Sequence, residues 1–312
     1  MSASAAVEAA AGALGDRAQR DVSLAGYTTY RVGGAAALLV EVADEADLAA
    51  LAKVVSATGV AVLVVGRGSN LLVSDAGFAG LAVVLGEAFA TISLEAVPLV
   101  TVGAAASLPV IARRTAAAGL TGFEWAVGVP GSLGGAVRMN AGGHGSDMAQ
   151  TLRRVRVLDL ATGEDGWVPA AALDLSYRRS SVGAAQLVVA AELALTVGDR
   201  ERSEAELTDI VRWRRANQPG GANAGSVFTN PPGDSAGRLI EDAGAKGLRV
   251  GTAEVSTKHA NFIQADDGGR ADDVMALMIE VQRRVEAHSG ISLHPETHLV
   301  GFDDPRPDIE AS

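Results

Sequence analysis

The sequence Gly66-Arg67-Gly68-Ser69-Asn70 follows directly on the apolar run from Val60 to Val65. An apolar run of this kind predicts a buried strand, and small residues after it predict a tight turn. Such a turn leaves several backbone N–H groups free to converge on an anion, and a diphosphate suits it best. We therefore interpret residues 66–70 as a phosphate-binding turn.

Two better-known phosphate loops do not match this turn. A dinucleotide-binding βαβ fingerprint needs a third glycine where Leu71 stands, and its acidic residue comes much later than Asp75. A P-loop ends in Gly-Lys-Ser/Thr, and the turn has no lysine near it. The turn therefore binds a nucleotide differently or serves a steric role only, and taken alone the pattern favours the steric role.

Composition bounds the class of protein. The chain has 312 residues, of which 48% are hydrophobic, so two or three compact units are expected. A formal net charge of −11 argues against a nucleic-acid-binding surface. The absence of cysteine excludes a thiol nucleophile, iron–sulfur ligation and disulfides. It agrees with a reducing compartment, and we expect a cytoplasmic protein.

The composition at both ends of the chain predicts terminal tails. Residues 1–18 lack a basic start and carry Glu8 and Asp16, so they do not resemble a secretory signal. We expect them to form a disordered or helical tail, and the acidic, Pro-containing residues 303–312 to form another. No apolar run is long enough to span a bilayer, and no membrane contact is expected.

Hydrophobic periodicity predicts three blocks. In the first, strands at residues 37–42 and 60–65 flank a helix that Gly59 ends, which makes a βαβ unit. The second has strands at 81–85, 99–102, 155–160 and 187–195 and a helix at 108–118. The third has helices at 204–215 and 272–288, the latter with one apolar face: Val274, Leu277, Met278, Val281 and Val285, with Gly290 as its stop.

A glycine-rich passage runs from Gly122 to Gly145. It holds seven glycines beyond Gly122, and Glu124 and Arg138 are its charged residues. This composition suits neither a flexible linker nor a good helix. Either something flat or phosphorylated approaches its backbone closely, or its glycines satisfy positive φ in a buried irregular turn.

Nine segments resemble consecutive motifs of one enzyme family, in the family's order. They are Thr28-Thr-Tyr-Arg-Val-Gly-Gly34, Gly66-Arg-Gly-Ser-Asn-Leu-Leu-Val-Ser-Asp-Ala-Gly-Phe-Ala-Gly80, Gly128-Val-Pro-Gly-Ser-Leu-Gly-Gly135, Met139-Asn-Ala-Gly142, Tyr177-Arg-Arg-Ser180, Ala224-Gly-Ser-Val-Phe-Thr-Asn-Pro231, Ala236-Gly-Arg-Leu-Ile-Glu-Asp-Ala-Gly-Ala-Lys-Gly247, Val255-Ser-Thr-Lys-His-Ala-Asn-Phe262 and His294-Pro-Glu296. The family is that of the UDP-N-acetylenolpyruvoylglucosamine reductases, flavoenzymes of peptidoglycan precursor synthesis. The resemblance covers about residue 20 to residue 302, nearly the whole chain.

The resemblance implies a multi-domain fold of α+β and α/β character. Two FAD-binding domains of the vanillyl-alcohol-oxidase type would precede a smaller C-terminal α/β domain that binds the substrate. In that fold the flavin diphosphate lies on backbone amides of a strand-to-loop turn, which agrees with the failed Rossmann match. We expect FAD-binding subdomains at residues 19–84 and 85–199 and the substrate-binding domain at residues 200–302.

The resemblance also implies the cofactor residues. Gly66, Arg67, Gly68, Ser69 and Asn70 would hold the FAD diphosphate. The rest of the FAD would be lined by Gly128, Val129, Pro130, Gly131, Gly134, Gly135, Asn140, Ala141 and Gly142, with Val129 and Pro130 keeping the loop rigid and apolar beside the isoalloxazine. NADPH would be the reductant and would share one pocket with the substrate, UDP-N-acetylglucosamine enolpyruvate, in alternation.

The implied reaction reduces the enolpyruvyl ether to a lactyl ether and yields UDP-N-acetylmuramate. Hydride adds to the methylene carbon, so charge builds on the carboxylate, and the next carbon then needs a proton. By motif match, Arg178 is the stabilising cation, Ser226 the proton donor and Glu296 the family's carboxylate. From the residues alone, Arg178 reads as a surface charge and Ser226 as a turn or capping hydroxyl.

A serine hydroxyl is a weak acid, so Ser226 needs a relaying water or a positive charge, for which Lys246, Lys258 and Arg178 are candidates. Arg214 is our candidate for the substrate diphosphate, because a guanidinium binds phosphate in bidentate fashion. Tyr177, Asn230 and His259 are further substrate-binding candidates, and each has a structural alternative.

Two departures from the family pattern stand out. Thr229 occupies a position where the family often has lysine. The short spacing from Arg178 to Ser226 indicates the family's shorter form, which lacks an extra loop with a substrate-clamping tyrosine.

Alternation over residues 291–299 predicts a strand with His294, Glu296 and His298 on one face. Two histidines and a carboxylate form a metal-ligand set. Side chains two apart on a strand lie about 6.5–7 Å apart, however, so all three converge on one ion only if the strand bends. We therefore expect a polar face and no metal.

The expected partners are the two small molecules, and we expect a monomer. The alternative functions are another FAD-dependent oxidase or dehydrogenase of the same fold, and a non-catalytic nucleotide-sugar binding module.

Overall fold

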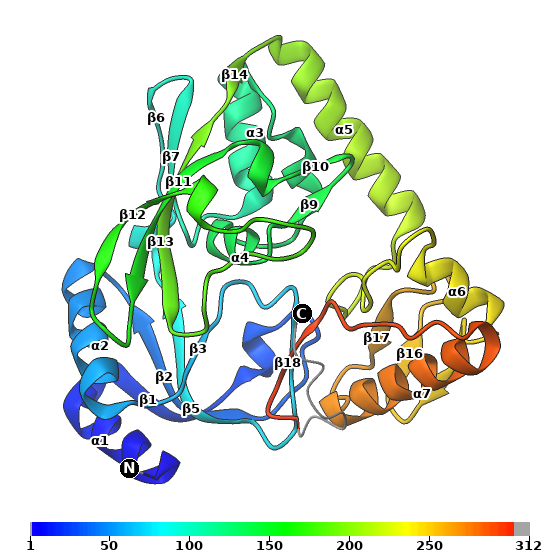
Figure 1. The fold of residues 1–312 in the computed structure, drawn as a ribbon, viewed down its shortest axis with the longest axis horizontal. Coiled ribbons are helices and arrows are strands. Elements are labelled where there is room, and N and C mark those ends of the chain that lie inside the picture. The colour runs from blue at the N-terminus through cyan, green and yellow to red at the C-terminus, as the bar shows by residue number, and fades with distance from the viewer. Residues whose placement is uncertain (1, 303–312) are drawn as a thin grey trace. The chain divides into compact units, whose positions relative to one another are not determined.

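The computed structural model describes residues 2–302, which divide into two compact units (Figure 1). Unit 1 contains the chain up to Val22, Ala37–Ser69 and Gly80–Gly220. Unit 2 contains Ser23–Ala36, Asn70–Ala79 and the chain from Gly221 onward. Each unit is therefore built from segments that lie far apart in the sequence.

The first sheet of unit 1 carries the βαβ pattern. Its strand order is β1 (Ala18–Ser23), β2 (Ala35–Val42), β5 (Phe78–Leu85) and β3 (Val62–Val64). Helix α2 (Glu45–Thr58) connects β2 to β3; the Asp44 side chain caps its start, and Gly59 ends it at φ 62°. β3 pairs in parallel with β5, so β5 lies between the two strands of the predicted unit.

The second sheet of unit 1 is antiparallel. Its order is β12 (Asp165–Pro169), β11 (Leu152–Asp159), β13 (Gln186–Ala194), β7 (Leu99–Gly103) and β6 (Ile92–Ala96). The helices of this part are α3 (Leu108–Ala117), α4 (Leu133–Arg138) and α5 (Arg200–Asn217). A buried apolar cluster that includes Val100, Ile111 and Val155 forms the core between them.

Short elements complete unit 1. They are the strand pairs β8 (Leu120–Thr121) with β14 (Thr196–Val197) and β9 (Gly142–Gly143) with β10 (Ser146–Asp147), and the 3₁₀ helices Gly15–Arg17, Glu87–Phe89, Glu124–Gly128, Met148–Gln150 and Ala170–Ala172.

Unit 2 packs helices on a small sheet. Strands β15 (Arg249–Val250), β16 (Ala253–Val255) and β17 (Ile263–Ala265) form the sheet, and Figure 1 shows α6 (Ala236–Asp242) and α7 (Ala271–Ser289) beside it. β4 (Leu71–Val73) pairs in parallel with β18 (His298–Val300). A 3₁₀ helix, Leu24–Tyr27, also belongs to this unit. The predicted apolar face of α7 is buried, and Gly290 ends the helix at φ 71°.

The disordered alternative for residues 1–18 is wrong. Helix α1 spans Ala3–Leu14, and it buries Ala6, Val7, Ala10 and Leu14 in the core cluster that also holds α2. Small alanine side chains let the two helices pack closely, which an alanine-rich tail does not reveal by itself. The second predicted tail, residues 303–312, lies outside the described residues.

Three further expectations need correction. The boundary at residue 200 is misplaced, because α5 packs on α3 and belongs to unit 1. The glycine-rich passage does contain a short helix, α4, whose buried Leu133, Ala136 and Val137 compensate for poor helix propensity. The predicted strand at 291–299 is regular only at β18, since Pro295 cannot donate to a ladder.

Within residues 2–302, none of the helices is both long enough and apolar enough to cross a membrane.

Candidate functional site

A cavity of about 210 Å³ in unit 1 brings the turn and the glycine-rich passage together. The turn contributes Gly66 and Arg67, and the passage contributes Gly134 and Gly135. The remaining lining comes from Val64, Val65, Val84, Leu85, Ala104, Ala105, Ser132, Arg138, Val182, Gln186, Leu187 and Val188. Two segments predicted to bind one cofactor, separated by more than sixty positions, thus face the same space.

Neighbouring side chains lie close to the backbone at two glycines of the cavity. A Cβ at Gly66 would lie 2.5 Å from Ser132 Oγ, and a Cβ at Gly134 would lie 3.1 Å from Ala104 Cβ. Backbone hydrogen bonds hold the passage there: Leu133 N donates to Ala106 O and Gly134 N to Ala104 O, each at 2.9 Å. A larger residue at either position would therefore force its neighbour to shift.

The charges around the cavity suit an anion. Arg67 is exposed, while Arg138 is half-buried and donates to Gly183 O at 2.7 Å. Burial lowers the pKa of the Arg138 guanidinium, which nevertheless stays charged. Glycine backbone and two cations match the diphosphate and flat ring system of FAD, so the residues present fit this cofactor.

The other predicted cofactor residues of unit 1 lie in the same two segments. Gly68 is buried at φ 58°, and Ser69 Oγ would lie 3.5 Å from a Cβ at Gly131. Gly128 ends a 3₁₀ helix, Val129 N donates to Ala126 O, and Pro130 is exposed. Ala141 is held by backbone bonds from its N to Ala136 O and from Met148 N to its O.

Arg178 lies on a turn that the glycine-rich passage holds. Its backbone has φ 57°, its Nη1 donates to Gly142 O at 3.0 Å, and the guanidinium lies 5.5 Å from the ring centre of Tyr177. Asn140 fixes the same turn, since its Nδ2 donates to Ser176 O at 2.9 Å. Arg178 is thus tied to two residues predicted to line the cofactor.

The side chain of Asn140 is fully engaged by protein groups. Besides Ser176 O, its Nδ2 donates to Asp147 Oδ2 at 3.3 Å, and its Oδ1 accepts from Ala149 N at 3.0 Å. The residue is buried, at 2% exposure. Its side chain therefore supports the Arg178 turn, and a cofactor contact of Asn140 remains a prediction for its backbone.

Arg214 lies near Gly128 in unit 1. Its Cδ would be 3.1 Å from a Cβ at Gly128, and the ring of Trp213 stands edge-on to His144 with centroids 5.2 Å apart. Burial lowers the pKa of Arg214. Burial and the charge of Arg214 lower the pKa of His144. The cluster combines one cation with an exposed aromatic ring.

In unit 2, Ser226 and Glu296 lie on neighbouring backbone segments. Glu296 N donates to the carbonyl of Val227, the residue after Ser226, at 2.7 Å. Phe228 forms an isolated β-bridge with Pro295, the residue before Glu296. The side chains of Ser226 and Glu296 are both half-buried. Two predicted catalytic residues separated by seventy positions are thus brought side by side.

Asn70 also contacts the Glu296 segment. Its Nδ2 donates to Glu296 O at 3.0 Å, and its carbonyl accepts from His298 N at 3.0 Å. The residue therefore holds the backbone on both sides of Thr297. Its predicted contact with the FAD diphosphate stays a prediction.

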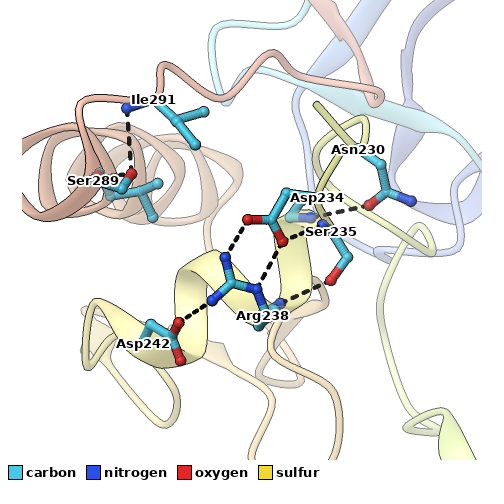
Figure 2. A network of polar contacts seen from close by, with 9 residues as sticks. Asn230, Asp234, Ser235, Arg238, Asp242, Ser289 and Ile291 are labelled. Atoms are coloured by element: carbon cyan, nitrogen blue, oxygen red, sulfur yellow. Dashed lines mark hydrogen bonds and ion pairs between the residues drawn. The ribbon is translucent and has the colours of Figure 1, made fainter. Parts of the chain in front are cut away.

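One of the weaker substrate candidates, Asn230, lies at the start of α6 (Figure 2). Asn230 Oδ1 accepts from Ala236 N at 3.0 Å, while Asp234 and Asp242 both pair with Arg238. His259 lies nearby, because its Cε1 would be 3.4 Å from a Cβ at Gly237. Burial lowers the pKa of His259.

Two side chains of unit 2 bear on expectations from the sequence, the departure at Thr229 and the charge proposed for Lys246. The Thr229 hydroxyl donates to His294 O at 3.3 Å, so threonine serves a backbone contact at that position. Lys246 pairs with Glu241 at 2.8 Å, which neutralises one of the three proposed sources of positive charge. In the described part of the chain, no group of three His, Asp or Glu side chains is arranged to hold a metal ion.

Sequence reasoning missed Ser132, Arg138, Gln186, His144 and Trp213. Arg138 carried a usable signal, as a charge in an otherwise apolar, glycine-rich passage. Gln186 and Trp213 carried none, because a single polar residue at a strand start or an aromatic residue on a polar helix has no distinctive pattern.

Comparison with known proteins gives two family matches. Residues 36–165 match the FAD binding domain, and residues 217–300 match the C-terminal domain of UDP-N-acetylenolpyruvoylglucosamine reductase. The predicted combination of FAD-binding structure with a smaller C-terminal domain of the reductase family is confirmed.

Relatives match over nearly their whole length. A UDP-N-acetylenolpyruvoylglucosamine reductase of Heliobacterium modesticaldum is 45% identical over 88% of both chains. A second, of Symbiobacterium thermophilum, is 41% identical over 92% of this chain and 93% of the relative. The crystal structure of the Thermus caldophilus enzyme has a TM-score of 0.80 at 36% identity, covering 91% of this chain and 99% of that one.

Proposed function

The chain belongs to the UDP-N-acetylenolpyruvoylglucosamine reductase family, and from that premise we propose that it reduces UDP-N-acetylglucosamine enolpyruvate to UDP-N-acetylmuramate with FAD and NADPH. This reaction serves peptidoglycan precursor synthesis. The observation that carries the proposal is the backbone pairing of the Ser226 and Glu296 segments, because protonation of the reacting carbon needs an acid that is held in position.

The glycine-lined cavity of unit 1 is the proposed FAD site. When bound, FAD supplies the hydride for the substrate's methylene carbon. Gly66, Gly134 and Gly135 give backbone access, and Arg67 and Arg138 offset the charge of the diphosphate. The remaining predicted contacts, from Gly68 to Asn70 and from Gly128 to Gly142, belong to the same proposal.

Arg178 is the proposed stabiliser of the substrate carboxylate. Negative charge builds on that carboxylate during reduction, and a fixed guanidinium lowers the energy of the charged state. Its bond to Gly142 O and the Asn140 contact to its turn hold it in place before the substrate arrives. A preorganised cation needs little rearrangement during the reaction.

Ser226 is the proposed proton donor, and Glu296 the carboxylate beside it. Because a serine hydroxyl is a weak acid, it can act only if the loss of its proton is compensated by neighbouring polar groups. Arg214 is proposed to hold the substrate diphosphate, with Tyr177, Asn230 and His259 as further substrate contacts. A monomer in the cytoplasm, where NADPH and nucleotide sugars are found, completes the proposal.

The function is tested on the purified protein and on Ser226→Ala. The wild type should be yellow, release FAD on denaturation and, without oxygen, consume more than one equivalent of NADPH only with the enolpyruvyl substrate. Ser226→Ala should retain the colour and its bleaching by NADPH but lose about 10²–10⁴-fold in turnover, the usual worth of a general acid. A colourless wild type, or full turnover of the variant, would contradict the proposal.

A further inference from the structure

Asn261 is a buried asparagine next to the proposed proton donor, and the proposed function gives it no role. It is 4% exposed and lies between β16 and β17. Its Oδ1 accepts from Phe228 N at 3.0 Å, and its Nδ2 donates to Phe228 O at 2.8 Å. Its own carbonyl accepts from Val227 N at 2.9 Å. Asn261 thus makes three hydrogen bonds to the two residues after Ser226.

The other edge of this segment faces the Glu296 strand segment. Val227 O accepts from Glu296 N at 2.7 Å and from Thr297 N at 3.4 Å, and Thr229 N donates to His294 O at 2.9 Å. Residues 227–229 therefore lie between Asn261 on one side and residues 294–297 on the other. The Asn261 carboxamide therefore holds Phe228, two residues after Ser226, in a segment whose other edge pairs with the Glu296 segment.

The residues that Asn261 bonds are buried, so water does not compete for these bonds. Val227 and Phe228 are at most 1% exposed, so water does not reach their peptide groups from the apolar core around them. Asn261 itself is fixed, since its backbone N donates to His259 Nδ1 at 3.2 Å. A buried peptide group that loses its partner shifts until it finds another.

We infer that Asn261 is a positioning residue for the protonation step, holding Ser226 at the right distance from Glu296 through the peptide of residues 227–229. The inference rests on the proposed function. It requires no contact between Asn261 and any ligand. Small displacements of a reacting group, of the order of 1 Å, cost about 10²-fold in rate.

The test separates the two halves of the reaction in Asn261→Asp. This change keeps the shape and the acceptor for Phe228 N but removes the donor to Phe228 O. Flavin reduction by NADPH should be unchanged. Reoxidation by UDP-N-acetylglucosamine enolpyruvate should slow by about 10- to 100-fold and show a larger solvent deuterium isotope effect, because proton transfer becomes limiting. Lowering the pH should partly restore the rate, since a protonated carboxyl can donate to Phe228 O.

A second readout does not depend on turnover. Amide hydrogen exchange in residues 226–229 and 294–297 should become faster in Asn261→Asp than in the wild type. Thr252→Ala is the matched control in unit 2, because Thr252 bonds to Asp273 and Arg270. It should lower thermal stability and leave both half-reactions unchanged. If Asn261→Asp fails to fold, Asn261→Ser is used instead, because its hydroxyl still offers one hydrogen-bonding group to Phe228.

Equal slowing of both half-reactions, or reoxidation as fast as in Thr252→Ala, would overturn the inference. A wild-type protein whose reduced flavin is not reoxidised by the enolpyruvyl substrate would instead count against the proposed function.

Discussion

Single glycines decide how closely two segments approach in this protein. In the β9–β10 hairpin, a Cβ at Gly142 would lie 2.5 Å from Ser146 O and 2.7 Å from Asp147 Cβ. Around a Cβ built at the adjacent Gly143, residues 2–302 place no atom within 4 Å. Gly142 also offers its carbonyl to Arg178. Of these two neighbouring glycines of one strand, Gly142 therefore has no room for a side chain, whereas Gly143 does.

Gly142→Ala should therefore destabilise the protein by about 1–3 kcal/mol, as overpacking does. It should also raise the KM for the enolpyruvyl substrate, because the acceptor of Arg178 moves. Gly143→Ala is the control and should stay within about 0.5 kcal/mol of the wild type. Urea unfolding measures the stability, and steady-state kinetics measure the KM. If Gly142→Ala and Gly143→Ala change both quantities equally, the steric explanation is wrong.

The residue contacts that hold the site could not have been predicted from the sequence. The bonds from Asn70 to Glu296 and from Asn261 to Phe228 join residues 226 and 33 positions apart. A polar residue in a motif gives no sign of whether it faces a ligand or a distant backbone. Asn70 and Asn140 were both assigned to the cofactor, and the side chains of both turn out to hold backbone groups of the protein.

At the level of elements, local periodicity predicted most of the regular structure. Helix α7 has a period-3.6 apolar face and a glycine stop, and both are where the pattern put them. The periodicity failed where packing decides the outcome. Helix α1 is alanine-rich and forms against α2, and α4 forms in a glycine-rich segment because its apolar residues are buried.

A buried carboxylate joins α5 to the glycine-rich passage. Glu124 is 5% exposed, and it accepts from Ser203 Oγ at 2.6 Å and from Gly122 N at 2.8 Å. Burial alone would raise the pKa of Glu124, but hydrogen bonds from Ser203, Thr121 and the backbone outweigh burial and hold the pKa below its usual value. The bonded carboxylate therefore stabilises the folded state.

Glu124→Gln should reduce the free energy of unfolding at pH 7 by about 1.5–3 kcal/mol, the range for hydrogen bonds to a charged group. Since the folded-state pKa is the lower one, this stabilisation is present above the unfolded-state value and is lost as the pH falls through the folded-state pKa. The difference in free energy of unfolding between wild type and variant, measured by urea unfolding, should become smaller below pH 4.5, the ordinary pKa of this carboxyl. If this difference in free energy stays constant from pH 7 to pH 3, the ionised Glu124 carboxylate is not the source of the stabilisation.

At the scale of the molecule, the chain order does not follow the division into units. Residues 23–36 and 70–79 belong to unit 2 although they lie in the N-terminal half of the sequence, and α5 belongs to unit 1. Continuous domain boundaries drawn on the sequence could not anticipate this, because β4 meets its partner β18 only after more than two hundred residues. The ordered motifs nevertheless predicted the family and fold, since the order of motifs along the chain does not depend on the division into units.

The division has a consequence for function. The proposed cofactor cavity and Arg178 belong to unit 1, and the proposed acid pair Ser226 and Glu296 belongs to unit 2. Hydride supply and proton supply are thus assigned to different units. Variants of Ser226, Glu296 and Asn261 should spare NADPH oxidation, whereas variants of the cavity glycines should impair both half-reactions.

The central claim is tested most directly by a single turnover without oxygen. The purified protein is reduced with one equivalent of NADPH and mixed with UDP-N-acetylglucosamine enolpyruvate. We predict that the oxidised flavin spectrum returns and that the sugar nucleotide gains two hydrogens, as seen by mass spectrometry. A flavin that stays reduced, with the enolpyruvyl compound recovered unchanged, would contradict the assignment.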